Sequence, residues 1–161
     1  MIQRRAGFTI LELTIALSLI VVLSGLVVVR LSFGSSRQQT IDAARKFGNL
    51  IRTYREKAVN EERLYALRFD AATGKYDVFA APGHALTAES MASALKSGVL
   101  APPLAFGKTV SQTFEIPAPV TLVFNARGLL PDLQIEILNE NGSRVMLRPD
   151  PLINEVYYDA P

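Results

Sequence analysis

The first fifth of the chain differs from the rest in its pattern of apolar residues. Phe8 to Val29 form a mostly apolar run of 22 residues in which Glu12 is the only charged residue. As a helix with a rise of ~1.5 Å per residue, this run is about 33 Å long, close to the ~30 Å hydrocarbon core of a bilayer. The pattern therefore predicts a single transmembrane helix over residues 8–30.

Beyond this run, apolar residues recur at spacings of three and four, with charged and amide side chains on the opposite arc. This period is typical of an amphipathic helix, which we expect to continue the first helix over residues 31–63. The apolar stripe consists of Ala44, Phe47, Leu50, Ile51, Tyr54 and Ala58. We expect the stripe to pack on a sheet, and we expect a bend at Gly34-Ser35-Ser36, between the two halves of the helix.

From residue 64 onward the apolar period changes to two, which is typical of strands. Tyr65–Phe69 and Tyr76–Phe79 flank turn residues and predict a β-hairpin. A short helix is expected over residues 87–97, with Thr87 as its N-cap. Later strands are expected over residues 120–124, 133–137, 144–148 and 152–158, with a tight turn at 139–142. The predicted fold class is α+β: one long N-terminal helix packed on antiparallel sheet, with the β domain over residues 64–161.

Composition argues against several kinds of chemistry. The chain has no cysteine, which excludes disulfides, cysteine-ligated zinc and thiol catalysis. His84 is the only histidine, it has no companions at metal-ligand spacing, and no nucleophile, phosphate-loop or metalloprotease motif occurs. We therefore expect no enzyme activity, no metal and no cofactor. The net charge of +2 is too small to predict strong general binding of nucleic acid.

Two surface features have both a functional and a structural interpretation. The basic residues Lys108, Arg127, Arg144 and Arg148 form either a patch that contacts DNA or separate solvated side chains, and we favour the second. Asn141-Gly142-Ser143 matches a glycosylation sequon. In a hairpin turn, however, Asn-Gly is better explained by its preference for positive φ.

The start of the chain is compatible with three interpretations. A secretory signal peptide has a shorter apolar region than this one. A plain membrane anchor fits the length but gives no reason for Glu12. The third interpretation rests on Gly7-Phe8-Thr9-Ile10-Leu11-Glu12, which follows a short basic leader and precedes the apolar run. This arrangement resembles the signal of the type IV pilin family.

The resemblance implies a specific processing route. In that family a membrane-embedded aspartyl prepilin peptidase cuts after the glycine and methylates the new N-terminal residue. Carried over, residues 1–7 are a cleaved leader, cleavage falls between Gly7 and Phe8, and Phe8 becomes N-methylated. Glu12 is then the family's glutamate, which pairs with the N-terminal amine of a neighbouring subunit. The resemblance also implies single-pass insertion in the bacterial inner membrane, with the C-terminal domain in the periplasm.

A second, narrower resemblance covers most of the chain. Arg68-Phe69-Asp70, Thr73-Gly74 and Phe124–Gly128 resemble the H-type minor pseudopilins of type II secretion and, equally, the related FimT-like minor pilins. This implies a non-enzymatic subunit of a periplasmic pseudopilus, with other pseudopilins, an inner-membrane assembly platform and membrane lipid as partners. Two alternatives stay open: a type IV pilus minor pilin that assists assembly or contacts DNA, and a membrane-anchored periplasmic binding module that does not polymerise.

Overall fold

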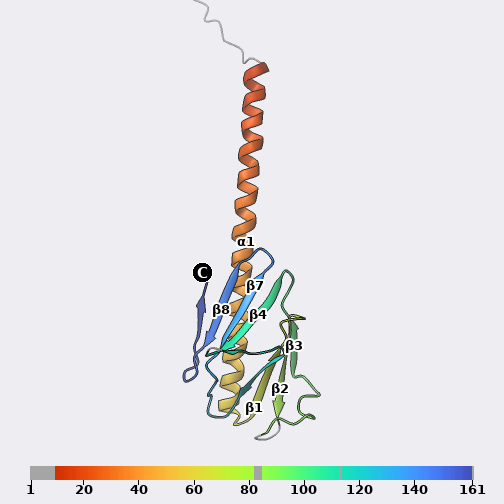
Figure 1. Ribbon diagram of the computed structural model, residues 1–161, viewed down its shortest axis with the longest axis vertical. Helices are drawn as coiled ribbons and strands as arrows, with labels where there is room; N and C mark the ends of the chain where they lie inside the picture. Colours follow the sequence, from red (N-terminus) through yellow and green to blue (C-terminus); the bar gives the residue numbers. More distant parts are fainter. Residues whose placement is uncertain (1–9, 82–84, 113, 161) are drawn as a thin grey trace, which may run out of the picture. The chain divides into compact units, whose positions relative to one another are not determined.

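The structure is a computed structural model that describes residues 10–81, 85–112 and 114–160, with the side chains of residues 23–35 outside that description (Figure 1). Contacts divide the chain into two compact units, residues 1–35 and 36–161. Helix α1 (Ile10–Asn60) contributes to both units. The helical backbone continues through Gly34-Ser35-Ser36, so the predicted bend does not interrupt α1.

Within the second unit, α1 buries the predicted apolar stripe. All six stripe residues are at most 8% exposed, which confirms the amphipathic pattern. The helix ends at Asn60, three residues before the predicted end. The amide of Arg63 donates to the carbonyl of Ala58, and Glu62 has a φ of 51°, so a left-handed residue closes the helix as in a Schellman motif.

The first sheet packs on the helix and has the strand order β3-β2-β1-β6, with antiparallel neighbours throughout. Its strands are β1 (Leu64–Phe69), β2 (Lys75–Ala81), β3 (Lys96–Val99) and β6 (Val120–Phe124). The predicted hairpin is confirmed as β1–β2. Its turn is fixed by the Asp70 carboxylate, which accepts hydrogen bonds from the Ala72 amide and the Thr73 hydroxyl, and by Gly74 at a φ of 66°.

The second sheet has the order β5-β4-β7-β8-β9, again antiparallel. Its strands are β4 (Leu104–Ser111), β5 (Phe114–Glu115), β7 (Gln134–Asn139), β8 (Arg144–Pro149) and β9 (Val156–Asp159). The tight turn between β7 and β8 lies where the sequence predicts it. Only Gly142 in this turn has a positive φ, of 80°, so the glycine alone supplies the left-handed conformation and Asn141 does not.

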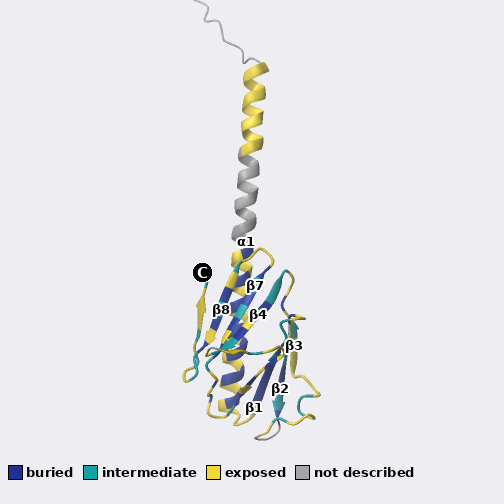
Figure 2. Cartoon of the chain, viewed as in Figure 1, coloured by how far each residue is buried: buried dark blue, intermediate teal, exposed yellow. Residues whose placement is uncertain are grey.

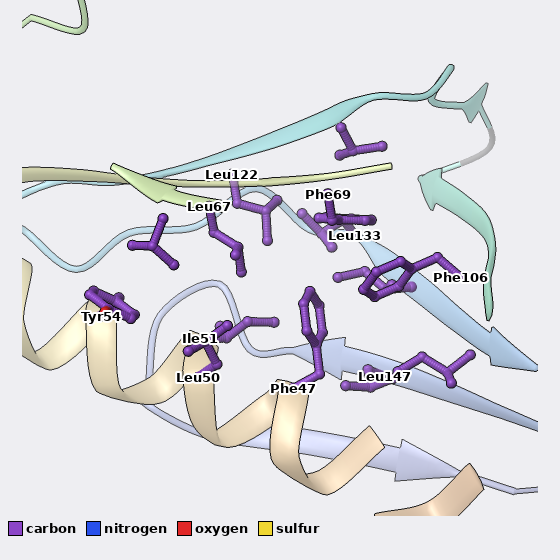
Figure 3. Packing of buried hydrophobic residues seen from close by; sticks show 14 of the residues in the cluster. Phe47, Leu50, Ile51, Tyr54, Leu67, Phe69, Phe106, Leu122, Leu133 and Leu147 are labelled. Carbon is purple, nitrogen blue, oxygen red and sulfur yellow. The ribbon is translucent and has the colours of Figure 1, made fainter. Parts of the chain in front are cut away.

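The core lies between α1 and both sheets (Figure 3). The Phe47 ring of α1 meets the Phe69 ring of β1 at a centroid distance of 5.5 Å and the Phe106 ring of β4 at 4.9 Å, both edge to face. Phe69 and Phe106 are themselves 5.0 Å apart. One aromatic residue from each of the three layers thus meets at one point, and the α+β fold class predicted from the sequence is confirmed.

The middle of the chain departs from the sequence prediction. Residues 87–97 form no helix. The Ser90 amide does donate to the Thr87 hydroxyl, but a single turn follows and the chain enters β3 at Lys96. The prediction was wrong because the capping signal of Thr87 is local, whereas pairing with β2 is not. Strand β4 was also missed, since Gly107 and Lys108 break its alternation at a register shift between Phe106 and Thr109.

Candidate functional site

The processing signal predicted from the sequence is only partly within the described residues. Gly7 and Phe8, the predicted cleavage and methylation residues, lie outside them. Glu12 lies in the first turn of α1 and is exposed. A carboxylate in the first turn interacts favourably with the partial positive charge of the helix N-terminus. Glu12 is therefore the one of the three predicted site residues that the structure describes, and its predicted role in assembly stays a prediction.

The segment that carries Glu12 is apolar on all sides. Every isoleucine, leucine and valine in residues 10–22 is exposed, from 53% for Ile15 to 85% for Ile10 (Figure 2). A helix with apolar residues all round has no polar face to turn toward water, which is typical of helices covered by lipid or by other helices. No other described residue of its unit covers this surface.

The polar side chains of this segment bond to its own backbone. The Thr14 hydroxyl donates to the Leu11 carbonyl at 2.8 Å, and the Ser18 hydroxyl donates to the Thr14 carbonyl at 2.9 Å. Such bonds let a hydroxyl enter an apolar environment without losing its hydrogen bond. Glu12 is then the one side chain of residues 10–22 that carries a charge.

The predicted membrane span 8–30 includes residues outside the description at both of its ends. Among the residues that are described, no helical segment combines the length and apolar character that a bilayer crossing requires. The span stays a prediction.

Sequence reasoning missed a buried cation on the second half of α1. Arg55 is 4% exposed, and its guanidinium donates to four main-chain carbonyl oxygens of the described residues. The Nε group donates to Gly128, in the loop between β6 and β7. The two terminal nitrogens donate to Asp150 at 2.7 Å, Pro151 at 3.0 Å and Ile153, all in the loop between β8 and β9. The side chain thereby joins α1 to the loop that connects the two sheets and to a loop of the second sheet.

Burial sets the electrostatics of this cluster. Desolvation lowers the pKa of the Arg55 guanidinium, and the Asp150 carboxylate partly opposes that effect. Arginine has so high an ordinary pKa that the group stays charged. A signal was present in the sequence: Arg55 falls four residues after Ile51 and three before Ala58, on the apolar side of the helix.

The C-terminal segment lies along the same helix. The Asn154 amide donates to the Glu56 carboxylate at 2.7 Å, and the Arg37 guanidinium donates to the Ala160 carbonyl at 3.4 Å. Between these contacts, the Tyr158 ring lies against Gly48, where a Cβ atom would overlap the phenol hydroxyl. Burial raises the pKa of this phenol. Strand β9 is thus held on α1 as well as on β8.

Of the four basic residues considered for DNA contact, Arg144 and Arg148 lie on β8, Lys108 lies on β4 and Arg127 lies in the loop between β6 and β7. Three of the four pair with acids. The nitrogen-to-oxygen distances are 3.5 Å for Lys108–Glu115, 3.9 Å for Arg144–Glu136 and 3.6 Å for Arg148–Asp132. Exposed pairs of this kind add little stability, but each carboxylate lowers the positive potential near its partner. The arrangement favours solvated side chains over a basic patch.

Two further sequence features bear on metal binding and on glycosylation. His84 lies outside the described residues, and the residues that are described hold no group of three or more side chains able to bind a metal ion. Asn141 of the sequon uses its amide within the fold, because it donates to the Ser36 hydroxyl of α1 at 2.8 Å. This contact holds the β7–β8 turn against the helix.

No model of a protein family matches this sequence, and no curated protein sequence does. Solved structures do match. The minor pseudopilin EpsH from the type 2 secretion system of Vibrio cholerae is similar with a TM-score of 0.57 and 16% identity, over 76% of this chain and 98% of EpsH. The type IV minor pilin FimU of Pseudomonas aeruginosa is similar with a TM-score of 0.55 and 18% identity, over 78% of this chain and 94% of FimU.

At such low identity the likeness concerns architecture. Both structures are covered almost over their whole length, and the shared features are a helix packed against antiparallel sheets. The chain therefore has the fold of the type IV pilin-like proteins, with an H-type minor pseudopilin among the structures that it resembles.

Proposed function

We propose that this chain is a non-enzymatic minor pseudopilin, processed by a prepilin peptidase and assembled into the periplasmic pseudopilus of a type II secretion system. In this proposal residues 1–7 are removed, Phe8 is N-methylated, and residues 8–30 anchor the subunit in the bacterial inner membrane before assembly. The second unit faces the periplasm. Partners are the peptidase, membrane lipid, an inner-membrane assembly platform and other pseudopilins.

One observation carries the proposal: a prepilin-like signal that ends in Glu12 leads into a helix whose apolar side chains are exposed and in which Glu12 is the one charged residue over residues 10–22. A plain anchor needs the apolar surface but not the carboxylate. A subunit that must first reside in lipid and then pack against other helices needs the apolar surface in both places. The pilin-like fold of the second unit supports the same conclusion.

Glu12 has a role in this proposal that follows from electrostatics. A carboxylate near the middle of a bilayer costs ~2.5–3.5 kcal/mol on insertion scales, and less near the end of a span. When neighbouring helices cover the segment, the carboxylate loses water and needs a cation. The methylated amine of a neighbour's Phe8 would supply about 4 kcal/mol at 4 Å and an effective dielectric near 20, before desolvation is subtracted.

A type IV pilus minor pilin is the second candidate, because FimU is as similar to this chain as EpsH is. A DNA contact in that setting is less favoured, since acids pair with Lys108, Arg144 and Arg148. A membrane-anchored binding module that does not polymerise is the third candidate. It shares the anchor with the other two but requires neither processing after Gly7 nor an assembled neighbour.

Intact-mass measurement of the membrane fraction tests the proposal. Co-expression with a prepilin peptidase is expected to remove Met1–Gly7 and add one methyl group to Phe8. A Gly7→Ala variant is the substrate control at the cut site, and a peptidase-free strain gives the precursor mass. An unchanged precursor, or cleavage near Ser24-Gly25, contradicts prepilin processing. Crosslinking in cells that contain both systems then separates the candidates, since partners would be pseudopilins in one case and pilins in the other.

A further inference from the structure

In the loop between β8 and β9, amide groups bond to acceptors of the same loop, while carbonyl groups accept hydrogen bonds from Arg55. The Asp150 carboxylate accepts hydrogen bonds from the amides of Leu152 at 2.8 Å and Ile153 at 3.0 Å, and the Asp150 amide donates to the Glu155 carbonyl. Pro151 has no amide hydrogen. The amides of Asp150, Leu152 and Ile153 thus bond within the loop, and the carbonyls of Asp150, Pro151 and Ile153 are turned toward Arg55.

The fourth acceptor comes from a different sheet connection. Gly128 follows β6, has a φ of 66° and points its carbonyl at the Nε group of Arg55. The two loops also bond directly, because the Leu130 amide donates to the Pro151 carbonyl at 3.2 Å. The result is a cage of main-chain oxygens built from residues 128 and 150–153. Within the described residues, this cage faces the guanidinium with acceptors and no donor.

A cage that offers only acceptors needs hydrogen-bond donors, and a cation that carries several donors suits it best. Carbonyl oxygens removed from water cost free energy unless a donor replaces the water, and several converging carbonyl dipoles together favour positive charge. Guanidinium suits this arrangement because it is planar, carries five donors in a fixed fork and is weakly hydrated. The geometry of the cage is therefore set by the backbone of two loops, and Arg55 supplies its charge.

We propose that these four carbonyl oxygens form a guanidinium-binding site, which Arg55 fills from within the chain and which binds free guanidinium ion when Arg55 is shortened. The site fastens the loop between β8 and β9, and with it the start of β9, onto α1. This role does not depend on whether the chain assembles in a secretion system or in a pilus.

Hydrogen exchange of the full-length chain in detergent micelles tests the site. In Arg55→Ala, amides in residues 150–155 and 128–130 are expected to exchange about tenfold faster or more, because several bonds to a charged group are lost. Guanidinium chloride at tens of millimolar, far below denaturing concentrations, is expected to restore protection, whereas equal sodium chloride is not. Arg52→Ala, an exposed change one turn earlier on α1, is the matched control and is expected to respond to neither salt.

Arg55→Lys keeps the proposal testable if the alanine variant does not fold. An ammonium group has three donors and cannot donate to all four carbonyls at once, so protection of residues 150–155 should be intermediate, with partial recovery on adding guanidinium. Full protection in Arg55→Lys would overturn the proposal. So would recovery of either variant by sodium chloride, or no recovery by guanidinium.

Discussion

The two halves of α1 contain the same kinds of apolar residue in opposite circumstances. In residues 10–22 every isoleucine, leucine and valine is at least 53% exposed, and these residues surround the helix. In residues 43–58 the apolar residues form one stripe and are at most 9% exposed, whereas Val59, just beyond this range, is 43% exposed. The difference indicates what shields each set of apolar residues from water. A one-sided stripe is covered by the chain's own sheets, whereas an all-round apolar helix needs lipid or another chain.

The comparison predicts that changes in the first half affect association and leave the fold intact. Glu12→Ala is expected to be cleaved and inserted normally, but its crosslinking to partner subunits should fall to background. Removing one partner of a buried ion pair costs about 3–5 kcal/mol, because the other charge stays buried. Glu12→Asp should be intermediate, since its arm is shorter. Thr14→Ala is the control, because the Thr14 hydroxyl bonds within its own helix. Wild-type crosslinking by Glu12→Ala would show the carboxylate to be dispensable.

Substitutions in the second half of α1 should instead destabilise the fold of the second unit. Phe47→Ala is expected to lower the free energy of unfolding of the second unit by about 3–5 kcal/mol, because it leaves a cavity where both sheets meet the helix. Leu17→Ala removes a similar apolar side chain from the first half and should leave that free energy unchanged. Denaturant unfolding followed by circular dichroism measures both. If both substitutions lowered the free energy of unfolding equally, the two halves of α1 would not differ in their contribution to the fold.

The contact between the second half of α1 and the loop between β8 and β9 should become less stable at acidic pH. Hydrogen bonds from the Ile153 and Leu152 amides lower the pKa of the Asp150 carboxyl below its ordinary value of about 3.9. Its stabilising contribution is therefore complete above that ordinary value and is lost as pH falls through the lowered folded pKa. The free energy of unfolding should be measured for wild type and for Asp150→Asn between neutral and strongly acidic pH. The loss of stability that comes from protonating Asp150 should be missing in the variant. Identical profiles would contradict the assignment.

A smaller effect is expected at Gly48, on the side of α1 that meets Tyr158. Alanine gains up to ~1 kcal/mol over glycine in a helix interior, but its Cβ overlaps the Tyr158 hydroxyl. The two effects should nearly cancel in Gly48→Ala. In a Tyr158→Ala background the same change should stabilise by about 1 kcal/mol, because only the helix gain remains. A double-mutant cycle measures the coupling, and a coupling of zero would place Tyr158 away from Gly48 in solution.

The smallest effect is expected from deleting the first half. A chain that starts at Ser36 should fold alone, with mixed helix and strand by circular dichroism and cooperative melting, because its core lies entirely within residues 43–147. Its melting midpoint should match that of the second unit in the full chain. A disordered or purely helical spectrum would mean that the second unit needs the apolar segment.

Sequence patterns predicted the parts of the molecule in which one period continues over many residues. The stripe from Ala44 to Ala58 and the β1–β2 hairpin are of this kind. The patterns failed where long-range pairing decides, as at Thr87, whose capping turn leads into β3, and at Gly107, which breaks the alternation of β4. Of the candidate sites, the prepilin-like signal is visible as a motif. The Arg55 cage is not, because its ligands are backbone atoms with no side-chain signature.

The return of β6 to the first sheet has a consequence for how the second unit unfolds. The chain completes β4 and β5 in the second sheet before Val120 pairs with Phe69 in the first, and it then goes back to add β7 to β9. Neither sheet is a contiguous piece of chain, so neither can detach while the other stays whole. The second unit should unfold in a single cooperative step, with tyrosine fluorescence and circular dichroism changing together. A chain pulled by its helix would keep this unit whole or unfold all of it, with no partly unfolded form between.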